Sequence, residues 1–383
     1  MGLAFIALGL IFIWGAETSC SWAESNIVRV AVITDATQIE LTIRSPYQIL
    51  ALNTNEELYK GRRLWRAKVA PGESGIKIGK DDFKIYGLRI QPKKSPAIYL
   101  NGRKFRGTID IVRQPDKRLL VVNRLDVEEY ICGVLYHEVA PWWPMEALKA
   151  QAIAARSFAL YQSRVNAHKD YDLESSVYSQ VYGGRTSERG RTSKAVRLSK
   201  NKVLTYKNKL FPTFYHATCA GHTEKASNLW NINLPPLRGR ECQFCQRSPH
   251  SRWKKKVSLQ DIEEGLEKAG FKVGSIKSIE IADRNVSGRI TALEIISTRG
   301  GLRVDANRFR LAVGPNIIRS TNFTVQIKNR QAYFDGQGWG HGVGMCQWGA
   351  FFMARKGFNA GQILGYYYPE SKLKDFSEDY ETF

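Results

Sequence analysis

The sequence predicts an α+β fold that is mostly antiparallel β, with a central pair of alanine-rich helices and a substrate cleft. Two observations support this prediction. Short β-branched segments, separated by Gly, Asn, Asp and Pro, fill the chain before residue 122 and recur from residue 275. A helical pattern over residues 125–168 lies between them. Helices segregated from a sheet in this way are typical of the α+β class.

The chain is long and strongly basic. Its 383 residues suffice for one large domain or two ordinary ones, each with its own core. Its 57 Lys and Arg exceed its 36 Asp and Glu, which gives a net charge of +21. Such a surface favours anionic partners, namely nucleic acid, anionic lipid or an acidic polymer. The alternative interpretation is that the charge only aids solubility.

Residues 1–23 are predicted to be a signal peptide. An apolar run extends from Leu3 to Gly15 and is too short for a membrane span. The tripeptide SWA offers a cleavage site before Glu24. No Lys or Arg precedes the apolar run, so an uncleaved anchor is the alternative. Export would make nucleic acid a poor partner and would favour an anionic polymer of the cell surface.

Residues 24–122 are predicted to form a β-rich N-terminal region. Its strand-like segments include IVRVAVIT, AIYLNG, GTIDIVR and LLVVNRL. Near the other end of the chain, residues 257–270 show a helical period and end at a glycine. Three further strand-like segments follow, SIKSIEIAD, ITALEIIST and FTVQIKN.

Glu138 lies on the apolar face of the first predicted helix. Apolar residues recur there at i, i+3, i+4, i+7 and i+8, at Val127, Tyr130, Ile131, Val134 and Leu135. Glu138 is four residues beyond Val134, so its carboxylate points inward or into a cleft. Desolvation raises the pKa of a carboxylate, and a raised pKa suits a general acid. The alternative is a structural carboxylate that caps a helix or pairs with Arg156.

The second predicted helix opens at Pro144 and supports the segment that carries Glu138. It is apolar nearly all round, which predicts burial. Its small residues would let neighbouring backbones approach closely. They form two stripes, Leu148, Ala152, Ala155 and Ala159, and Ala147, Ala150, Ala154 and Phe158.

Cysteines and histidines cluster in two segments. FYHATCAGHTE supplies His216, Cys219 and His222, and ECQFCQRSPH supplies Cys242, Cys245 and His250. One H-x-x-C pair and one C-x-x-C pair make a plausible tetrahedral zinc site of one His and three Cys. The alternative is a disulfide of Cys219 with Cys242 or Cys245. Four protein ligands would make the metal structural.

A glycine-rich segment, GQGWGHGVGMCQWGA, runs from Gly336 to Ala350. It lacks the Lys-Ser/Thr ending of a phosphate loop, so nucleotide binding is weakly supported. Four of its side chains predict a surface for a polar ligand with apolar faces, such as a sugar: Trp339, His341, Gln347 and Trp348. The alternative is a tight structural turn before a core helix.

Three blocks together resemble the SpoIID/LytB family, named for stage II sporulation protein D and the amidase enhancer. They are LDVEEYICGVLYHEVAPWWPMEALKAQAIAARSFAL, SQVYGG at Ser179–Gly184, and GWGHGVGMCQWGA with YYYPES. The resemblance covers about residues 27–370, and the cysteine block is similar to the zinc-carrying branch. It implies a catalytic region over residues 123–372 and leaves a tail at 373–383.

The resemblance implies a peptidoglycan lytic transglycosylase that cuts the bond between N-acetylmuramic acid and N-acetylglucosamine. Such an enzyme leaves 1,6-anhydro ends and prefers strands stripped of stem peptides. The family's catalytic glutamate falls on Glu138. The resemblance also implies cleft residues at Ser179, Gln180, Tyr182, His341 and Gln347, and zinc ligands at His216, Cys219, Cys242 and Cys245, with His222 as substitute.

Two other functions compete with this one. Some family members are described as enhancers of an N-acetylmuramoyl-L-alanine amidase, so a non-catalytic binder with an amidase as partner is the first alternative. A zinc-dependent hydrolase is the second, and it would need an open position on the metal. The expected location is the periplasm or cell envelope, with a role in sporulation, division or growth.

Overall fold

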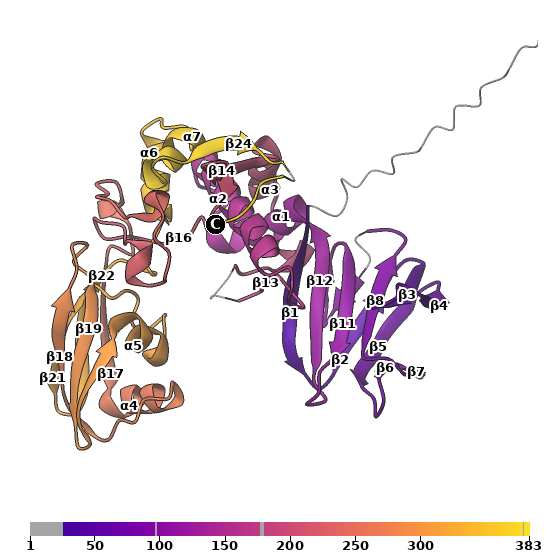
Figure 1. Cartoon of the computed structure of the whole chain (residues 1–383), viewed down its shortest axis with the longest axis horizontal. Coiled ribbons are helices and arrows are strands. Elements are labelled where there is room, and N and C mark those ends of the chain that lie inside the picture. The colour runs from indigo at the N-terminus through magenta and orange to yellow at the C-terminus, as the bar shows by residue number, and fades with distance from the viewer. Residues whose placement is uncertain (1–25, 96–97, 177–179, 378) are drawn as a thin grey trace, which may run out of the picture.

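Two β lobes are joined by a central helical layer in the computed structural model, which describes residues 26–95, 98–176, 180–377 and 379–383 (Figure 1). The N-terminal lobe and the second lobe lie on opposite sides of the helices. Every pairing between the named strands is antiparallel, apart from those of β1 with β13 and of β16 with β23. The predicted α+β class is therefore confirmed.

The N-terminal lobe is a two-layered β structure. Its sheets have the strand orders β13-β1-β12-β11-β8-β3-β4 and β10-β9-β2-β5-β6-β7. The strands are β1 (Ile27–Ala36), β2 (Ile39–Ile43), β3 (Tyr47–Ala51), β4 (Glu57–Gly61), β5 (Leu64–Pro71), β6 (Ile76–Ile78), β7 (Asp81–Phe83), β8 (Gly87–Pro92), β9 (Ile98–Leu100), β10 (Arg103–Phe105), β11 (Thr108–Arg113), β12 (Leu119–Asp126) and β13 (Leu173–Glu174).

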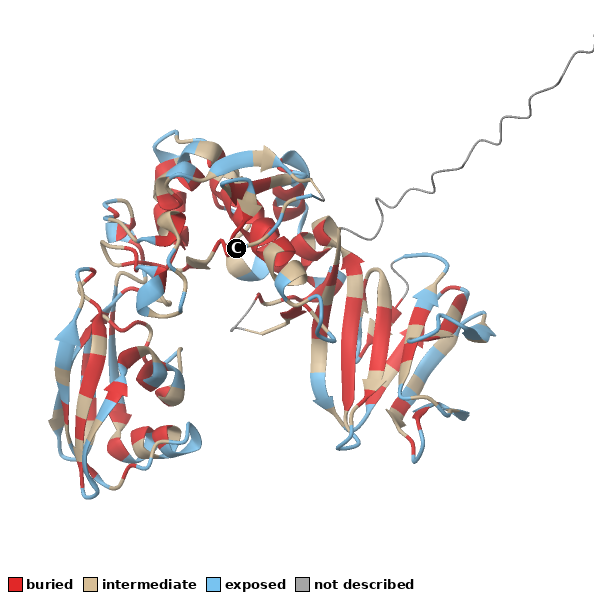
Figure 2. Ribbon diagram, viewed as in Figure 1, coloured by how far each residue is buried: buried red, intermediate tan, exposed pale blue. Residues whose placement is uncertain are grey.

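Alternating burial explains the two layers of this lobe. In β2, Ile39, Leu41 and Ile43 are buried, and in β9 Ile98 and Leu100 are buried on either side of half-buried Tyr99. Side chains of a strand point to opposite faces in turn, so each sheet has one face in the shared core. Figure 2 shows buried residues along the central strands of this lobe and within the helices.

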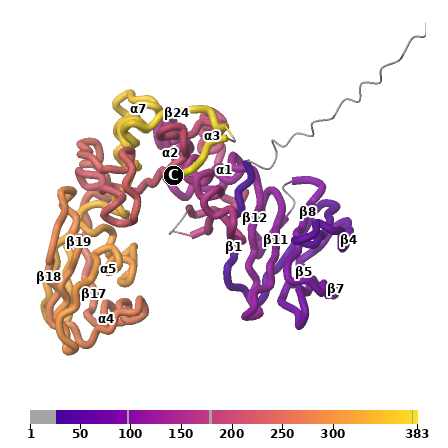
Figure 3. The backbone as a smooth tube through the Cα atoms, in the orientation of Figure 1, coloured from indigo at the N-terminus to yellow at the C-terminus, as the bar shows by residue number. Residues whose placement is uncertain are grey.

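The central layer holds five helices and short strands. The helices are α1 (Val127–Glu138), α2 (Met145–Val165), α3 (Gly190–Leu198), α6 (Gln347–Arg355) and α7 (Ala360–Tyr367). The strands are β14 (Lys202–Tyr206), β15 (Lys209–Leu210), β16 (Tyr215–His216), β23 (Met345–Cys346) and β24 (Lys372–Asp375). Strand β24 pairs with β14, which returns the C-terminal segment to the helices (Figure 3).

Helix α1 buries the apolar face that the sequence predicts. Asp126 caps its first turn by accepting a hydrogen bond from the Glu128 N–H at 2.8 Å. The helix ends at Glu138 because Val139 is extended and Pro141 follows. The five apolar residues of the predicted face are all buried: Val127, Tyr130, Ile131, Val134 and Leu135.

Helix α2 is the buried axis of the central layer. Its residues from Ala147 to Leu160 are buried, apart from Lys149, so both predicted small-residue stripes lie in the interior. Pro144 is the N-cap rather than the first helical residue. Small side chains let α1, α3, α6 and α7 approach this helix.

The second lobe is an insertion between β16 and β23. It contains β17 (Arg252–Ser258), β18 (Ile276–Arg284), β19 (Ile290–Ser297), β20 (Gly300–Asp305), β21 (Phe323–Lys328) and β22 (Gln331–Gln337), with helices α4 (Leu259–Lys268) and α5 (Ala306–Val313). These elements share a core of their own. The predicted helix over 257–270 and the three predicted strands become α4, β18, β19 and β21.

The predicted signal segment, residues 1–23, lies outside the described residues. Within the part of the chain that the structure describes, none of the helices is long and apolar enough to cross a membrane.

Candidate active site

A cleft of about 990 Å³ opens where the central layer faces the inserted lobe. The end of α1 and the segment after it form one wall, and residues around α5 form another. The cleft is lined by aromatic and polar side chains, including Tyr136, His137, Glu138, Trp142, Trp143, Gln180, Phe214, Tyr215, His216, Trp230, His250, Asn307, Arg310, Leu311, Asn316, Trp339, His341, Gln347 and Trp348. A cleft of this composition suits a polar ligand with apolar faces.

Glu138 is half-buried and lines this cleft. Burial of its carboxyl raises the pKa from 4.5 to about 7. Gln347, the Val181 N–H and the Tyr215 hydroxyl act in the opposite direction, because they stabilise the ionised form. The Gln347 amide donates to Glu138 Oε2 at 3.4 Å. A carboxyl with a pKa near neutrality can both give and take a proton.

A buried hydrogen-bond chain aims the Tyr215 hydroxyl at Glu138. Tyr130 donates to Gln180 Oε1 at 2.9 Å, which fixes the orientation of the Gln180 amide. Gln180 Nε2 then donates to the Tyr215 oxygen at 2.8 Å. The Tyr215 oxygen is therefore an acceptor toward Gln180, and its hydrogen is left for the Glu138 carboxylate.

The parallel pairing of β16 with β23 brings the parts of this site together. Tyr215 pairs with Met345 and His216 with Cys346, so Gln347 follows directly at the start of α6. A side chain at Gly344 would lie 1.9 Å from the Phe214 carbonyl, and the residue has a φ of +71°. Glycine at this position is therefore required for the close approach of the two strands.

Arg156 is not the partner of Glu138. Its guanidinium forms an ion pair with Glu128 at 2.7 Å, and its side chain is 1% exposed. None of the ion pairs among the described residues includes Glu138. Within the described part of the chain, the Glu138 carboxylate is thus not held in a structural ion pair.

Four buried thiols form a second cluster beside the cleft. Their sulfur atoms all lie within 4.8 Å of one another and belong to Cys219, Cys242, Cys245 and Cys346. Backbone N–H groups of Cys219 and Gly349 donate to Cys346 Sγ at 3.4 and 3.3 Å. Hydrogen bonds from Cys219 and other neighbouring thiols lower the pKa of Cys245. The set can therefore hold a metal ion that prefers sulfur ligands.

Comparison with known proteins identifies relatives along most of the chain. The model of a family described as "Stage II sporulation protein" matches residues 115–206. A protein of *Brachyspira hyodysenteriae* without a characterised function is 30% identical over 93% of this chain and 95% of its own. The stage II sporulation protein D of *Bacillus subtilis* is 28% identical over 66% of this chain and 76% of its own. The chain belongs to the SpoIID/LytB family.

Two further matches cover only part of a relative or part of this chain. The amidase enhancer of *Bacillus subtilis* is 26% identical over 78% of this chain, but the match spans about half of that relative, 49% of its length. The model of a domain of unknown function (DUF8618) matches residues 239–344, which include the inserted lobe. This SpoIID/LytB protein therefore combines the sporulation-protein region with an inserted region that matches a domain of unknown function.

The predicted substrate-contacting residues of this SpoIID/LytB chain fall into three groups. Gln180, Trp339, His341 and Gln347 line the cleft. Tyr182 does not line it, because its ring is 1% exposed and its hydroxyl donates to Asn123 Oδ1 at 2.9 Å within the core. Ser179 lies outside the described residues.

The predicted metal set differs from the observed cluster at one position. Cys346 takes the place of His216, and His222 is also outside the cluster. His216 and Cys346 are register partners on β16 and β23, so the residue that the sequence pattern indicates lies beside the cysteine that completes the cluster. His216 instead contacts the Val343 carbonyl through Nδ1 at 3.0 Å and lines the cleft. The Nδ1 atom of His222 lies 2.6 Å from the Thr223 carbonyl oxygen.

Sequence reasoning missed several cleft residues. Tyr215 carries no motif signal of its own, although it immediately precedes His216 in the cysteine and histidine segment. Trp142 and Trp143 lie four and five residues after Glu138. Their rings pack with Trp348 and Phe351 at 5.1–6.4 Å between ring centroids. Asn307 and Arg310 come from the inserted lobe, and no pattern links them to Glu138.

Proposed function

We propose that this protein is a peptidoglycan lytic transglycosylase and that Glu138 is its general acid and base. The observation that carries the proposal is a half-buried carboxyl with a pKa of about 7 that lines a cleft rich in aromatic side chains. The substrate is the glycan strand of peptidoglycan, cut between N-acetylmuramic acid and N-acetylglucosamine.

The reaction needs one carboxyl that changes its protonation state. Neutral Glu138 gives its proton to the glycosidic oxygen as the bond from that oxygen to the anomeric carbon of muramic acid breaks. The resulting carboxylate accepts the proton of the muramic acid 6-hydroxyl, whose oxygen bonds to the same carbon. The product is a 1,6-anhydro end, and no water is consumed. Tyr215 and Gln347 stabilise the carboxylate between these steps.

The composition of the cleft favours this reaction over hydrolysis. Ordinary glycosidases use two carboxyl groups, one of which activates water or attacks the sugar. Among the described residues that line the cleft, Glu138 is the only carboxylate. One carboxyl suffices when the attacking hydroxyl belongs to the substrate.

Charge and aromatic side chains favour strands without stem peptides. Removal of the peptide exposes the lactyl carboxylate of muramic acid, which suits a chain with a net charge of +21. Rings such as Trp142, Trp339 and Trp348 offer flat apolar surfaces to the faces of sugars. The expected location is outside the cytoplasm, in the periplasm or cell envelope.

We assign the four-thiol cluster to a structural zinc ion. In a tetrahedral site with Zn–S bonds of about 2.3 Å, the sulfurs stand about 3.8 Å apart. The observed separations of up to 4.8 Å, with a 3.3 Å contact between Cys219 and Cys245, are compatible with that spacing. Four thiolates would complete the coordination, so the ion would brace the loops beside the cleft rather than bind substrate.

Mass spectrometry of reaction products tests the proposal. Peptide-stripped strands are incubated with wild type and with Glu138→Gln. Anhydro products, lighter than hydrolytic ones by one water molecule, are expected from wild type alone. Hydrolytic ends, or cleavage by the Gln variant, would contradict the assigned mechanism.

A non-catalytic role is the second candidate, and the similarity to an amidase enhancer favours it. In that role the chain would bind glycan strands and stimulate an amidase. Absence of cleavage by wild type, together with amidase stimulation that survives Glu138→Gln, would assign this function instead.

A further inference from the structure

Basic and aromatic side chains form a row on the outer face of the six-stranded sheet. The row starts at β10, an edge strand, and crosses β9, the end of β2, and β5, which are consecutive neighbours in that sheet. With two residues beside the cleft, it makes up what we call the basic-aromatic track: Tyr136, Arg189, Lys104, Tyr99, Arg44 and Trp65.

Close contacts connect the members of the track on the sheet. The Lys104 ammonium lies 5.4 Å from the centre of the Tyr99 ring. The Arg44 guanidinium lies 4.6 Å from the same ring and 5.5 Å from the Trp65 ring. Cations and ring faces thus alternate across four strands, and Trp65 at the far end is 69% exposed.

A short 3-10 helix, η2 (Gly184–Ser187), links the sheet edge to the cleft. The Lys104 N–H donates to Thr186 Oγ1 at 3.2 Å, and Arg189 donates to the Thr186 carbonyl at 3.0 Å. The Arg189 guanidinium also lies 4.3 Å from the centre of the Tyr136 ring. Tyr136 lines the cleft two residues before Glu138, so the track is continuous with the proposed active site.

Two carboxylates close in sequence to members of the track are paired with cations outside it. Glu40, on the same sheet, pairs with Arg66 at 2.8 Å. Glu188, next to Arg189, pairs with Arg106 at 2.6 Å. Three cationic side chains, Arg44, Lys104 and Arg189, therefore give the track a net positive charge. Of its rings, those of Tyr136 and Trp65 are exposed and that of Tyr99 is half-buried.

We propose that the basic-aromatic track is an extended binding surface for the part of an anionic glycan strand that leaves the cleft. The cations match the regularly spaced carboxylates of a peptide-stripped strand, and the rings match its sugar faces. The inference rests on the proposed function for the identity of the polymer. The inference gives the N-terminal lobe a role in binding the strand. The proposed chemistry at Glu138 does not by itself require this role.

Strand binding in a variant that does not cleave tests the track directly. In a Glu138→Gln background, Arg44→Ala with Trp65→Ala is compared with the parent for its Kd toward long, peptide-stripped strands. Roughly tenfold weaker binding is expected, equivalent to about 1.4 kcal/mol. When Arg44→Ala and Trp65→Ala are introduced into the wild-type protein instead, its cleavage of short oligosaccharides that fit within the cleft is expected to be unchanged.

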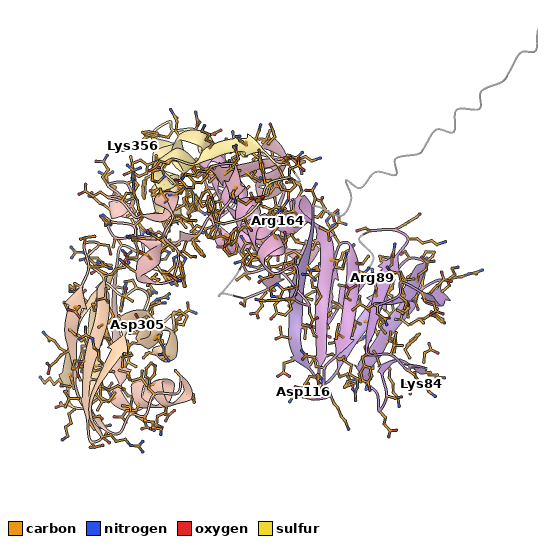
Figure 4. The ribbon with its side chains drawn as sticks, viewed as in Figure 1. Lys84, Arg89, Asp116, Arg164, Asp305 and Lys356 are labelled. Carbon is orange, nitrogen blue, oxygen red and sulfur yellow. The ribbon has the colours of Figure 1, made fainter. Side chains whose placement is uncertain are left out.

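A matched control lies on the same lobe. Lys84→Ala with Tyr86→Ala also removes one cation and one exposed ring, since Tyr86 is 57% exposed. Lys84 follows β7, the opposite edge of the sheet from β10, and Figure 4 shows it at the end of the lobe far from the helices. Binding within twofold of the parent is expected. Arg44→Lys with Trp65→Tyr should retain most of the affinity.

The outcomes separate this inference from the proposed function. Unchanged strand binding in the Arg44 and Trp65 variant would overturn the proposed role of the track. An equal loss of strand binding in the Lys84 and Tyr86 control would also overturn it. Loss of amidase stimulation with unchanged strand binding would also overturn it and would assign the surface to a protein partner. If wild type fails to cleave but strand binding still depends on Arg44 and Trp65, the transglycosylase proposal fails and the track stands.

Discussion

Gln347 donates its side-chain amide to the carboxylate of Glu138 at 3.4 Å, although 209 residues separate the two in the sequence. Helix α1 ends at Glu138 and α6 begins at Gln347. Burial favours the neutral carboxyl, whereas the amide favours the ionised one. The protonation state of Glu138 therefore depends on its burial, which dominates, and on the opposing hydrogen bond from the start of α6.

Replacement of Gln347 should shift the pH dependence of activity. Gln347→Ala removes a hydrogen bond that lowers the pKa of Glu138, so that pKa should rise further. Because the proposed general acid works when protonated, the loss of kcat/KM at high pH should move to higher pH. A pH profile of both proteins measures this. Gln260→Ala, at an exposed position on α4, is the control, and a profile shifted to lower pH in Gln347→Ala would contradict the assignment.

Glu138 should also make stability depend on pH. Below pH 4.5 the Glu138 carboxyl is protonated in both the folded and the unfolded protein. Between pH 4.5 and 7 it is mostly ionised in the unfolded protein but still mostly protonated in the folded protein. The folded protein therefore loses stability as pH rises through this range. Glu138→Gln stays neutral, so above pH 7 it should be more stable than wild type by on the order of 2–3 kcal/mol, with little difference at pH 4.

Urea unfolding at pH 4 and pH 8 measures this difference. Glu267→Gln changes one exposed surface charge on α4 and is the control. An equal effect of Glu138→Gln at both pH values would mean that the carboxyl is not desolvated in the folded protein.

Local pattern was enough to predict the helices around the site. The apolar face of α1 needs only the spacing of five residues, and the burial of α2 follows from its lack of a polar face. Both properties lie within one sequence window, so propensity and periodicity determine them. Glu138 was predictable for the same reason, since its inward position follows from the helical period.

Contacts between distant segments were not predictable in this way. Cys346 joins three other cysteines because β23 pairs with β16, and a parallel register between segments more than a hundred residues apart has no local signal. His216 has the H-x-x-C spacing to Cys219 that the local pattern favours, but Cys346 is the fourth member of the observed cluster. Likewise, Asn307 and Arg310 reach the cleft only because the inserted lobe folds toward the helices.

The metal content of cysteine and histidine variants should distinguish a four-cysteine site from a site that includes a histidine. Cys346→Ser is expected to lose most of the bound zinc and to lower the Tm, because metal binding and folding are coupled. His222→Ala should retain one zinc ion per chain, because His222 lies outside the thiol cluster. Metal analysis of the purified proteins, with thermal unfolding before and after chelation, gives both readouts. Full zinc content in Cys346→Ser with loss in His222→Ala would instead support His222, the substitute ligand that the sequence predicts.

The buried ion pair of Arg156 with Glu128 should be a large determinant of stability. Arg156 donates to both carboxylate oxygens of Glu128, at 2.8 and 2.7 Å, and to the Lys202 carbonyl at 3.0 Å, so it connects α2 to α1 and β14. Arg156→Met leaves the carboxylate without its buried cation, which should cost about 3–5 kcal/mol.

A double variant separates the charge effect from packing. Arg156→Met with Glu128→Leu removes both charges, so it should recover much of the lost stability, because a buried pair can be replaced by apolar residues at little cost. Lys149→Met, which breaks the more exposed pair of Lys149 with Glu146, should cost no more than about 1 kcal/mol. Unfolding free energies of the four proteins measure these terms. If the double variant were as unstable as Arg156→Met, lost packing around the guanidinium rather than the unpaired carboxylate would be the cause.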